Sequence, residues 1–520
     1  MRSILALRDF ALVVVASCVT FLAPAAFAWD TPRFDPIPCP DLPPQLANAR
    51  CGYLIVPEDR SQPSDRTIQN FVAIIPAQSS KPAPDPVVYM GTGPGGIATL
   101  EVAGLIDGGI NRNHDLVVMN QRGQFLSIPT LTCLAIDDFA RHLLSLRFYS
   151  ESTKRIHLRA TADCHRELIA TGADLPSYNS TESAADFADL RTVLGFSEWN
   201  VLGVSYGTDL AQMFVRDHPE GVRSVVFDSV VPVTITIAKY WPSTRAGFDG
   251  LFQACAAEAA CNAAHPNLET TVTDLVNTLE AEPLTITMRD PANGEDLKIV
   301  VDGGALIDWL RDQSRTNTSL TRIPDLLDQL ARGRAEALAA IAMYRIQLAP
   351  PSKPGAPSTS YGLAYGVGCR EQFSTHEEVA EAGRQAFPLY PASIQDQAVA
   401  TWAYTSDDCR RVWKVPAAPA EVRQPLVSSL PTLLISGSFD AVTSLDFAKS
   451  VAASLSTSTV ISIPGIGHFV LPHSPCAQRV TASFLTDPSN PDTSCVGALK
   501  PPAFTPFQPE GVAPTVPAIQ

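Results

Sequence analysis

The sequence predicts an α/β fold, in which a mostly parallel β-sheet is covered by helices and interrupted by a helical cap. Three observations support this prediction. Short apolar runs alternate with helical patterns as far as residue 233, as is typical of parallel strands covered on both faces. Helix-like segments and proline-rich joints replace this alternation over residues 234–426. Strand-like apolar runs return between residues 427 and 495.

The predicted organisation follows these changes of pattern along the chain. It consists of a signal peptide (1–28), the first part of the α/β core (29–233), the helical cap (234–426), the second part of the core (427–495) and a proline-rich tail (496–520).

The first 28 residues have the pattern of a secretory signal. Arg2 and Arg8 precede an apolar run, and Ala26-Phe-Ala28 offers a cleavage site. The apolar run is too short to cross a membrane as a helix. We therefore expect an exported protein, periplasmic or secreted, with no transmembrane segment. The alternative is a lipid anchor on Cys18, because residues 15–18 resemble a bacterial lipobox, although the residues that follow remain apolar.

Ten cysteines follow the predicted signal peptide and its Cys18. An even number in an exported chain favours disulfides. No Cys-x-x-Cys spacing is present, so we expect no metal site. The sequence does not fix which cysteines pair. Pairing each cysteine with its neighbour, our preferred assignment, gives Cys39–Cys51, Cys133–Cys164, Cys255–Cys261, Cys369–Cys409 and Cys476–Cys495.

The composition limits the kind of partner. The chain has 38 Lys and Arg against 53 Asp and Glu, a formal net charge of −15. An acidic chain of this kind is not expected to bind nucleic acid. Its 45% of hydrophobic residues is enough for an ordinary packed core.

The first strands are predicted at residues 52–57 and 71–75, as a hairpin. A buried strand at residues 87–90 then leads into the loop Gly91-Thr-Gly-Pro-Gly-Gly96. Backbone N–H groups in such a loop can point at a ligand oxygen, as an oxyanion hole requires. Gly93 is therefore a candidate oxyanion donor.

A strand, a sharp turn and a helix are predicted around Ser205. The apolar run 199–204 enters the turn Gly203-Val-Ser-Tyr-Gly207, and a helical pattern follows over residues 209–216. A Gly-x-Ser-x-Gly turn in this context holds its serine in a strained conformation at the carboxyl edge of the sheet. Ser205 is therefore the candidate nucleophile, and the N–H of Tyr206 is the second candidate oxyanion donor.

A serine hydroxyl needs a nearby base, and histidine is suited to this role because its pKa lies near neutral pH. Of the nine histidines, His468 alone follows a predicted strand within a Gly-x-Gly-His turn. Asp440 ends an earlier predicted strand and is the candidate for orienting the imidazole. His473 and Asp446 are weaker alternatives because both are predicted to lie in or beside helices.

These motifs together resemble the exported tripeptidyl aminopeptidase and proline iminopeptidase branch of the α/β-hydrolases, including its tripeptidyl-aminopeptidase-like C-terminal region. The resemblance extends from about Cys51 to Cys495. It rests on Cys51-Gly-Tyr-Leu-Ile-Val-Pro57, Gly93-Pro-Gly-Gly96, Gln121-Arg-Gly123, Gly203-Val-Ser-Tyr-Gly-Thr208, Cys369-Arg-Glu371, Gly437-Ser-Phe-Asp-Ala-Val-Thr443 and Gly467-His-Phe469. It implies an α/β-hydrolase fold, a catalytic triad of Ser205, Asp440 and His468, and no cofactor.

The chain departs from the family pattern near the expected oxyanion hole. Thr92 stands where a glycine is usual, Asn120 replaces an aspartate, and Thr443-Ser444 replace the usual proline. No catalytic atom is lost, but the walls of the site are altered. The family's substrate preference therefore does not transfer directly to this chain.

The resemblance also implies hydrolysis of peptides from a free amino end, or of simple esters. An aminopeptidase needs a carboxylate for the substrate's ammonium group, because burying that charge unpaired is costly. Glu371, which matches the family's Cys-x-Glu, is our candidate. Cys369, Arg370, Trp402 and Trp413 are further candidates to line the pocket.

We therefore expect an exported serine hydrolase that forms an acyl-enzyme on Ser205, most simply an aminopeptidase. A carboxylesterase with the same triad is the alternative, and a non-catalytic binding protein on the same scaffold is a third hypothesis. The expected partner is a peptide or small-molecule substrate. The sequence does not indicate the oligomeric state.

Overall fold

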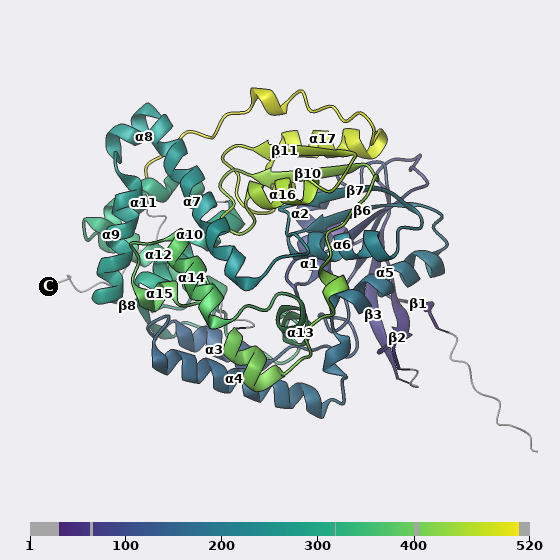
Figure 1. Ribbon diagram of the computed structural model, residues 1–520, viewed down its shortest axis with the longest axis horizontal. Helices are drawn as coiled ribbons and strands as arrows, with labels where there is room; N and C mark the ends of the chain where they lie inside the picture. Colours follow the sequence, from purple (N-terminus) through teal and green to yellow (C-terminus); the bar gives the residue numbers. More distant parts are fainter. Residues whose placement is uncertain (1–30, 63–65, 318, 400–404, 509–520) are drawn as a thin grey trace, which may run out of the picture.

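The computed structural model describes residues 31–62, 66–317, 319–399 and 405–508. An α/β core and a cap of helices lie side by side in it (Figure 1). The predicted signal peptide with Cys18, Trp402 and the end of the tail lie outside the described residues. None of the helices in the described part of the chain has the length and apolar character that crossing a bilayer demands.

Within the described residues the central sheet has nine strands, in the order β1-β2-β3-β5-β4-β6-β7-β10-β11. Strands β1, β2, β3 and β5 pair antiparallel, and the remaining pairs, from β5 to β11, are parallel. The bounds are β1 (Arg33–Ile37), β2 (Arg50–Pro57), β3 (Thr67–Ile75), β4 (Val87–Met90), β5 (Leu116–Met119), β6 (Trp199–Val204), β7 (Val222–Asp228), β10 (Thr432–Gly437) and β11 (Ser458–Ile463). The predicted α/β class, with a mostly parallel sheet, is confirmed.

Strand β1 was not predicted, because its segment is rich in proline. It is the outermost strand, and Pro36 lies opposite Gly52 of β2. An edge strand tolerates proline, since a missing N–H on its outer side breaks no ladder bond. Gly52 is needed for this pairing: a Cβ there would lie 2.3 Å from the ring of Phe34.

Helices cover both faces of the sheet. Successive strand residues point to opposite faces, so Val88 packs in the same apolar cluster as Phe214 of α6, whereas Tyr89 packs in the cluster that contains Leu105 and Phe484. The core helices are α1 (Ala98–Glu101), α2 (Ala103–Asp107), α5 (Ser180–Leu194), α6 (Tyr206–Asp217), α16 (Leu445–Ala452) and α17 (Pro475–Thr486). Gly195, at φ 75°, ends α5, because glycine adopts this left-handed conformation without a Cβ clash.

The segment between β7 and β10 forms most of the cap. Its helices are α7 (Tyr240–Ala257), α8 (Ala259–Ala264), α9 (Leu268–Ala281), α10 (Gly303–Thr316), α11 (Ile323–Ala331), α12 (Ala335–Leu348), α13 (Tyr361–Glu371), α14 (His376–Ala386) and α15 (Ala392–Gln395). It also contains a hairpin of β8 (Leu284–Arg289) and β9 (Asp296–Val301), which the expectation of a helical cap did not include. Buried and exposed residues alternate in β8, as in a strand with one covered face.

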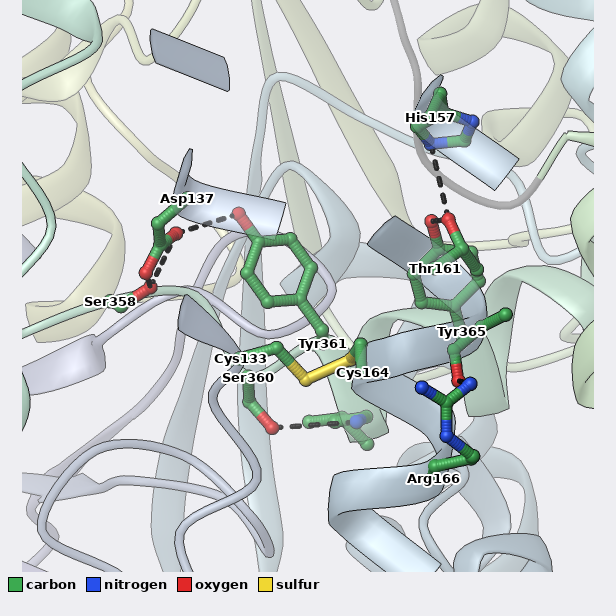
Figure 2. Close-up of a disulfide and its surroundings, with 12 residues drawn as sticks. Cys133, Asp137, His157, Thr161, Cys164, Arg166, Ser358, Ser360, Tyr361 and Tyr365 are labelled. Carbon is green, nitrogen blue, oxygen red and sulfur yellow. Dashed lines mark hydrogen bonds between the residues drawn. A yellow bond between two sulfur atoms is a disulfide. The ribbon is translucent and has the colours of Figure 1, made fainter. Parts of the chain in front are cut away.

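Two helices from the first part of the chain join the cap. Helices α3 (Leu134–Leu143) and α4 (Glu151–Ala170) are linked by the Cys133–Cys164 disulfide at the start of α3 (Figure 2). Phe148, between them, belongs to the same apolar cluster as Trp241 of α7. Asp137 of α3 accepts hydrogen bonds from the hydroxyls of Ser358 and Tyr361 at 2.8 and 3.0 Å (Figure 2). Helices α3 and α4, which precede the predicted range of the cap, therefore pack against the cap segment.

The structure contains five disulfides among its described residues. They join Cys39 to Cys51, Cys133 to Cys164, Cys255 to Cys261, Cys369 to Cys409 and Cys476 to Cys495. These are the pairs that the neighbour-with-neighbour assignment gives.

The described part of the tail runs from the core to the cap without helix or strand over residues 499–508 (Figure 1). Pro502 lies against Gly465 of the core. The N–H of Phe504 donates to the carboxylate of Glu258 at 2.9 Å, and the N–H of Thr505 donates to the carbonyl of Thr321 at 3.1 Å.

Candidate active site

Ser205 stands in the turn between β6 and α6, as the sequence predicts. Its backbone has φ 56° and ψ −125°, a strained conformation for a residue with a side chain. The glycines on either side permit the turn. A Cβ on Gly207 would lie 2.0 Å from the carbonyl oxygen of Met90, at the end of β4, and one on Gly203 would lie 2.5 Å from the carbonyl oxygen of Gly207.

His468 and Asp440 meet at the same edge of the sheet. Nδ1 of His468 lies 2.9 Å from Oδ2 of Asp440, and both residues are buried. The other oxygen, Oδ1, accepts the backbone N–H groups of Val442 and Thr443, each at 2.8 Å. Burial alone would raise the pKa of Asp440, but the charge of His468 and the hydrogen bonds from His468 and Thr443 outweigh it and lower the pKa below its usual value. Asp440 is thus held ionised, as an orienting carboxylate must be.

Thr443 adds a contact that sequence reasoning did not find. Its hydroxyl donates to Oδ2 of Asp440 at 2.7 Å and lies 3.1 Å from Nδ1 of His468. The sequence showed Thr443 only as a departure from the usual proline. In the structure its hydroxyl contacts both Asp440 and His468.

The backbone around His468 is fixed from two sides. On the cap side, Asn317 donates from Nδ2 to the carbonyl of His468 at 2.8 Å and accepts the N–H of Gly467 at 2.6 Å. On the core side, Asp228, at the end of β7, accepts the N–H groups of Val470 and Leu471 at 3.0 and 2.8 Å. Burial raises the pKa of Asp228 to about 6. Neither Asn317 nor Asp228 was identified from the sequence, because each acts across a long separation in the chain.

Ser205 and His468 line one cavity of about 130 Å³ beneath the cap. Its described lining comprises Thr92, Gly93, Ser205, Ile237, Tyr240, Arg311, Arg315, Val399, Val442 and His468. Gly93, a predicted oxyanion donor, therefore lines the same cavity as Ser205, the candidate nucleophile. Tyr206 is the first residue of α6, where backbone N–H groups have no acceptor within the helix.

Glu101 holds the loop that carries Gly93. One carboxylate oxygen accepts the backbone N–H of Thr92 and the hydroxyl of Tyr89, both at 2.8 Å, and the other accepts the hydroxyl of Thr92 at 2.7 Å. Thr92, which replaces a glycine of the family pattern, thus ties the loop to α1. No motif pointed to Glu101.

Glu371, the predicted ammonium ligand, is not among the described lining residues of this cavity. It is buried at the end of α13, and its carboxylate accepts the N–H and the hydroxyl of Ser180 at 2.9 and 2.5 Å. The Ser180 hydroxyl lies 2.9 Å from that of Tyr206. Burial raises the pKa of Glu371 to about 6. Glu371 is therefore connected through Ser180 to Tyr206, the residue after Ser205. Its role towards substrate stays a prediction.

Cys369, Arg370, Trp413, Asp446 and His473 are not among the described lining residues of the Ser205 cavity. Trp413 is buried and stacks on Tyr365 with ring centroids 4.6 Å apart. Asp446 lies on α16, and His473 lies in a short 3₁₀ turn (Leu471–His473). A larger cavity of about 560 Å³, between α2 and α17, includes no member of the triad. In the described part of the chain no three His, Cys, Asp or Glu side chains converge as they would around a metal ion.

Residues 105–475 match the family model described as the alpha/beta hydrolase fold. The chain therefore belongs to the α/β hydrolase fold family, and it is a serine hydrolase. It is 24% identical to serine protease Hip1 of Mycobacterium tuberculosis over 87% of this chain and 89% of that protein. It is 28% identical to the tripeptidyl aminopeptidase of Streptomyces coelicolor over 35% of each chain. The predicted family resemblance is confirmed.

A solved structure, that of proline iminopeptidase from Mycobacterium smegmatis, is also similar. It is 14% identical, with a TM-score of 0.35, and the match covers 84% of this chain and 98% of that one.

Proposed function

We propose that this protein is an exported serine peptidase that releases residues or short peptides from a free amino end through an acyl-enzyme on Ser205. The observation that carries the proposal is the placement of Ser205 and His468 in one cavity, with His468 hydrogen-bonded to a buried Asp440. This is the arrangement that activates a serine for attack on a carbonyl carbon.

The proposed reaction uses the triad in the usual order of α/β hydrolases. Because Nδ1 of His468 faces Asp440, Nε2 is the nitrogen that takes the Ser205 proton as Oγ attacks the scissile carbonyl. The backbone N–H groups of Gly93 and Tyr206 receive the developing oxyanion. His468 then gives the proton to the leaving amine. A water molecule, activated by His468, hydrolyses the acyl-enzyme.

The size of the cavity supports action on chain ends. About 130 Å³ beneath the cap is small compared with typical ligand pockets, so it admits only a short part of a substrate. A cavity of this size suits a terminal residue or a short peptide better than the middle of a folded protein.

A second cavity supports recognition of a free amino end. It has about 360 Å³, and Ile237 belongs to the lining of both cavities. The charged groups of its described lining are Asp396, Asp407 and Asp408, with Lys154, His157, His376 and Arg410. The carboxylates of Asp396 and Asp407 are suited to pairing with an ammonium group that leaves water. Burial raises the pKa of Asp408 to about 7, so it is only partly ionised at neutral pH before an ammonium group binds. We propose this cavity as the position of the substrate's amino end, alongside the earlier candidate Glu371.

The test is a paired rate comparison on the purified mature protein. Aminoacyl- and tripeptidyl-p-nitroanilides, free and N-acetylated, are compared with p-nitrophenyl acetate and butyrate, and Ser205→Ala is the control. We expect anilide cleavage that depends on the free amino group and on Ser205. Cleavage of acetylated anilides at the same rate would contradict the aminopeptidase proposal.

The second candidate function is carboxylesterase activity with the same triad, which the small cavity also supports. Ester turnover without anilide cleavage would establish it. A folded protein that neither turns over substrate nor reacts with a fluorophosphonate at Ser205 would favour the binding-protein hypothesis.

A further inference from the structure

Two arginines of the cap line the Ser205 cavity. Arg311 and Arg315 lie four residues apart on α10, so they project from the same face of the helix. Among the described lining residues they are the only arginine or lysine side chains, and the guanidinium group of arginine carries a positive charge. The other described lining residues carry no carboxylate. The cavity is therefore positively charged in a chain whose formal net charge is −15.

The position of these arginines relative to the triad is fixed by the fold. Ser314, between them, accepts the backbone N–H of His468 on its carbonyl oxygen at 2.6 Å. A Cβ on Gly467 would lie 2.1 Å from that same oxygen, so α10 is packed directly on the backbone of the histidine turn. The guanidinium of Arg311 lies 5.9 Å from the centroid of the Tyr240 ring, a distance at which a cation–π contact orients it.

Two carboxyl groups on α10, those of Asp312 and Asp308, interact with these arginines. Oδ1 of Asp312 lies 3.6 Å from Nε of Arg315, and its other oxygen accepts the hydroxyl of Tyr344. Burial raises the pKa of Asp308 to about 7, although Arg345 and the two cavity arginines oppose the rise, so this carboxyl is partly protonated at neutral pH. Both arginines thus line a cavity whose described lining contains no carboxylate.

We propose that Arg311 and Arg315 form an anion subsite, and that the preferred substrate carries a carboxylate beside the bond that is cleaved. The planar guanidinium donates paired hydrogen bonds to carboxylates. The proposal rests on the proposed function, because it places the subsite in the cavity where Ser205 would act. The carboxylate has two possible sources: the side chain of an aspartate or glutamate next to the scissile bond, or the free carboxyl end of a short leaving group.

Binding to the catalytically inactive protein separates the subsite from the reaction. In the Ser205→Ala background, isothermal titration compares glutarate with its neutral diamide. We expect glutarate to bind at least about tenfold more tightly, since hydrogen bonds to charged groups are the stronger ones. The preference should be lost in Arg311→Gln/Arg315→Gln and retained in part in Arg311→Lys/Arg315→Lys. Equal affinities, or a preference that survives the double glutamine variant, would overturn the proposal.

Kinetics on the active protein identify the source of the carboxylate. One arm compares tripeptidyl-p-nitroanilides that end in Glu or Gln, and another compares tetrapeptides with a free or amidated carboxyl end. An ester arm compares mono-p-nitrophenyl glutarate with p-nitrophenyl butyrate. We expect kcat/KM to favour the anionic member of at least one pair about tenfold. Arg289→Gln, on the exposed hairpin, is the matched control and should keep that ratio.

The outcomes remain distinguishable from failure of the proposed function. If anilides are not cleaved but glutarate binds selectively and the anionic ester is preferred, the subsite stands and the aminopeptidase proposal fails. If anilides are cleaved with no preference in any pair and glutarate binds no better than its diamide, the aminopeptidase proposal stands and the subsite fails.

Discussion

The backbone N–H of His468 donates a hydrogen bond to the carbonyl oxygen of Ser314 at 2.6 Å. One residue belongs to the α/β core and the other to helix α10 of the cap. The contact therefore joins the candidate base directly to the domain that covers it. The position of the imidazole therefore depends on how the cap packs on the core. Asn317, at the end of α10, adds two more hydrogen bonds between the cap and the backbone of Gly467 and His468.

Replacing Asn317 by alanine should impair turnover more than substrate binding. The change removes hydrogen bonds to Gly467 and His468 and puts alanine at φ 57°, which it adopts poorly. Small misplacements of a catalytic group are costly, so we expect kcat to fall about tenfold with KM little changed. Asn317→Gly, which keeps the conformation and loses the side chain, separates the two effects. Unchanged kcat in both variants would show that Asn317 does not position His468.

Thr443→Val should lower kcat/KM by about tenfold, because it removes the hydroxyl that bonds Asp440 and lies beside His468. A buried hydrogen bond to a charged group is worth roughly 1.5–3 kcal/mol. Thr443→Ser retains the hydroxyl and serves as the control. Thermal unfolding should show both variants folded. A valine variant as active as the serine variant would assign Thr443 to packing alone.

Glu371→Gln should change how stability depends on pH. The folded pKa of about 6 exceeds the ordinary value of 4.5, so the unfolded chain releases this proton first as pH rises. The free energy of unfolding of the wild type should therefore fall relative to the variant between pH 4.5 and 6, by about 2 kcal/mol. Urea unfolding at pH 4 and pH 7 measures the difference. If wild type and variant differ by the same free energy of unfolding at pH 4 and at pH 7, the elevated pKa is contradicted.

The same variant tests the predicted role of Glu371 towards the substrate. If the carboxylate binds the ammonium group, anilide turnover should fall and ester turnover should not. The variant Asp408→Asn allows the same comparison of anilide and ester turnover for the second cavity. If Glu371→Gln leaves peptide and ester turnover alike unchanged, the ammonium role of Glu371 fails.

The disulfides should contribute unequally to stability. The Cys369–Cys409 disulfide joins cysteines that are 40 residues apart in the cap segment, whereas the Cys255–Cys261 disulfide joins cysteines that are 6 residues apart. Loop-closure entropy then gives about 4 and about 2 kcal/mol of stabilisation, respectively. Replacing both cysteines of each pair by serine and comparing urea midpoints checks the order. A larger loss from the short loop would indicate that native packing, not chain entropy, dominates.

Much of the site could be predicted because its chemistry is encoded in local motifs. The turn around Ser205, the strand end at Asp440 and the Gly-x-Gly-His turn at His468 each have a local sequence pattern. The chain order of the three then places them at one edge of a parallel sheet. The structure places all three there.

The contacts from the cap could not be predicted in this way. Arg311, Arg315 and Asn317 lie on a helix whose own sequence gives no sign of what it covers, and their role depends on long-range packing. The hairpin of β8 and β9, by contrast, could have been predicted, because apolar and polar residues alternate in the sequence of β8. Strand β1 was not predicted because its segment is rich in proline, and a strand tolerates proline only at the edge of a sheet.

The most direct test of the central claim is covalent labelling of the folded protein with a fluorophosphonate, followed by intact-mass measurement and peptide mapping. We predict one adduct, on Ser205, that is absent from Ser205→Ala and slowed by His468→Ala. No adduct on folded wild-type protein, or an adduct that persists in Ser205→Ala, would contradict the assignment of Ser205 as the nucleophile.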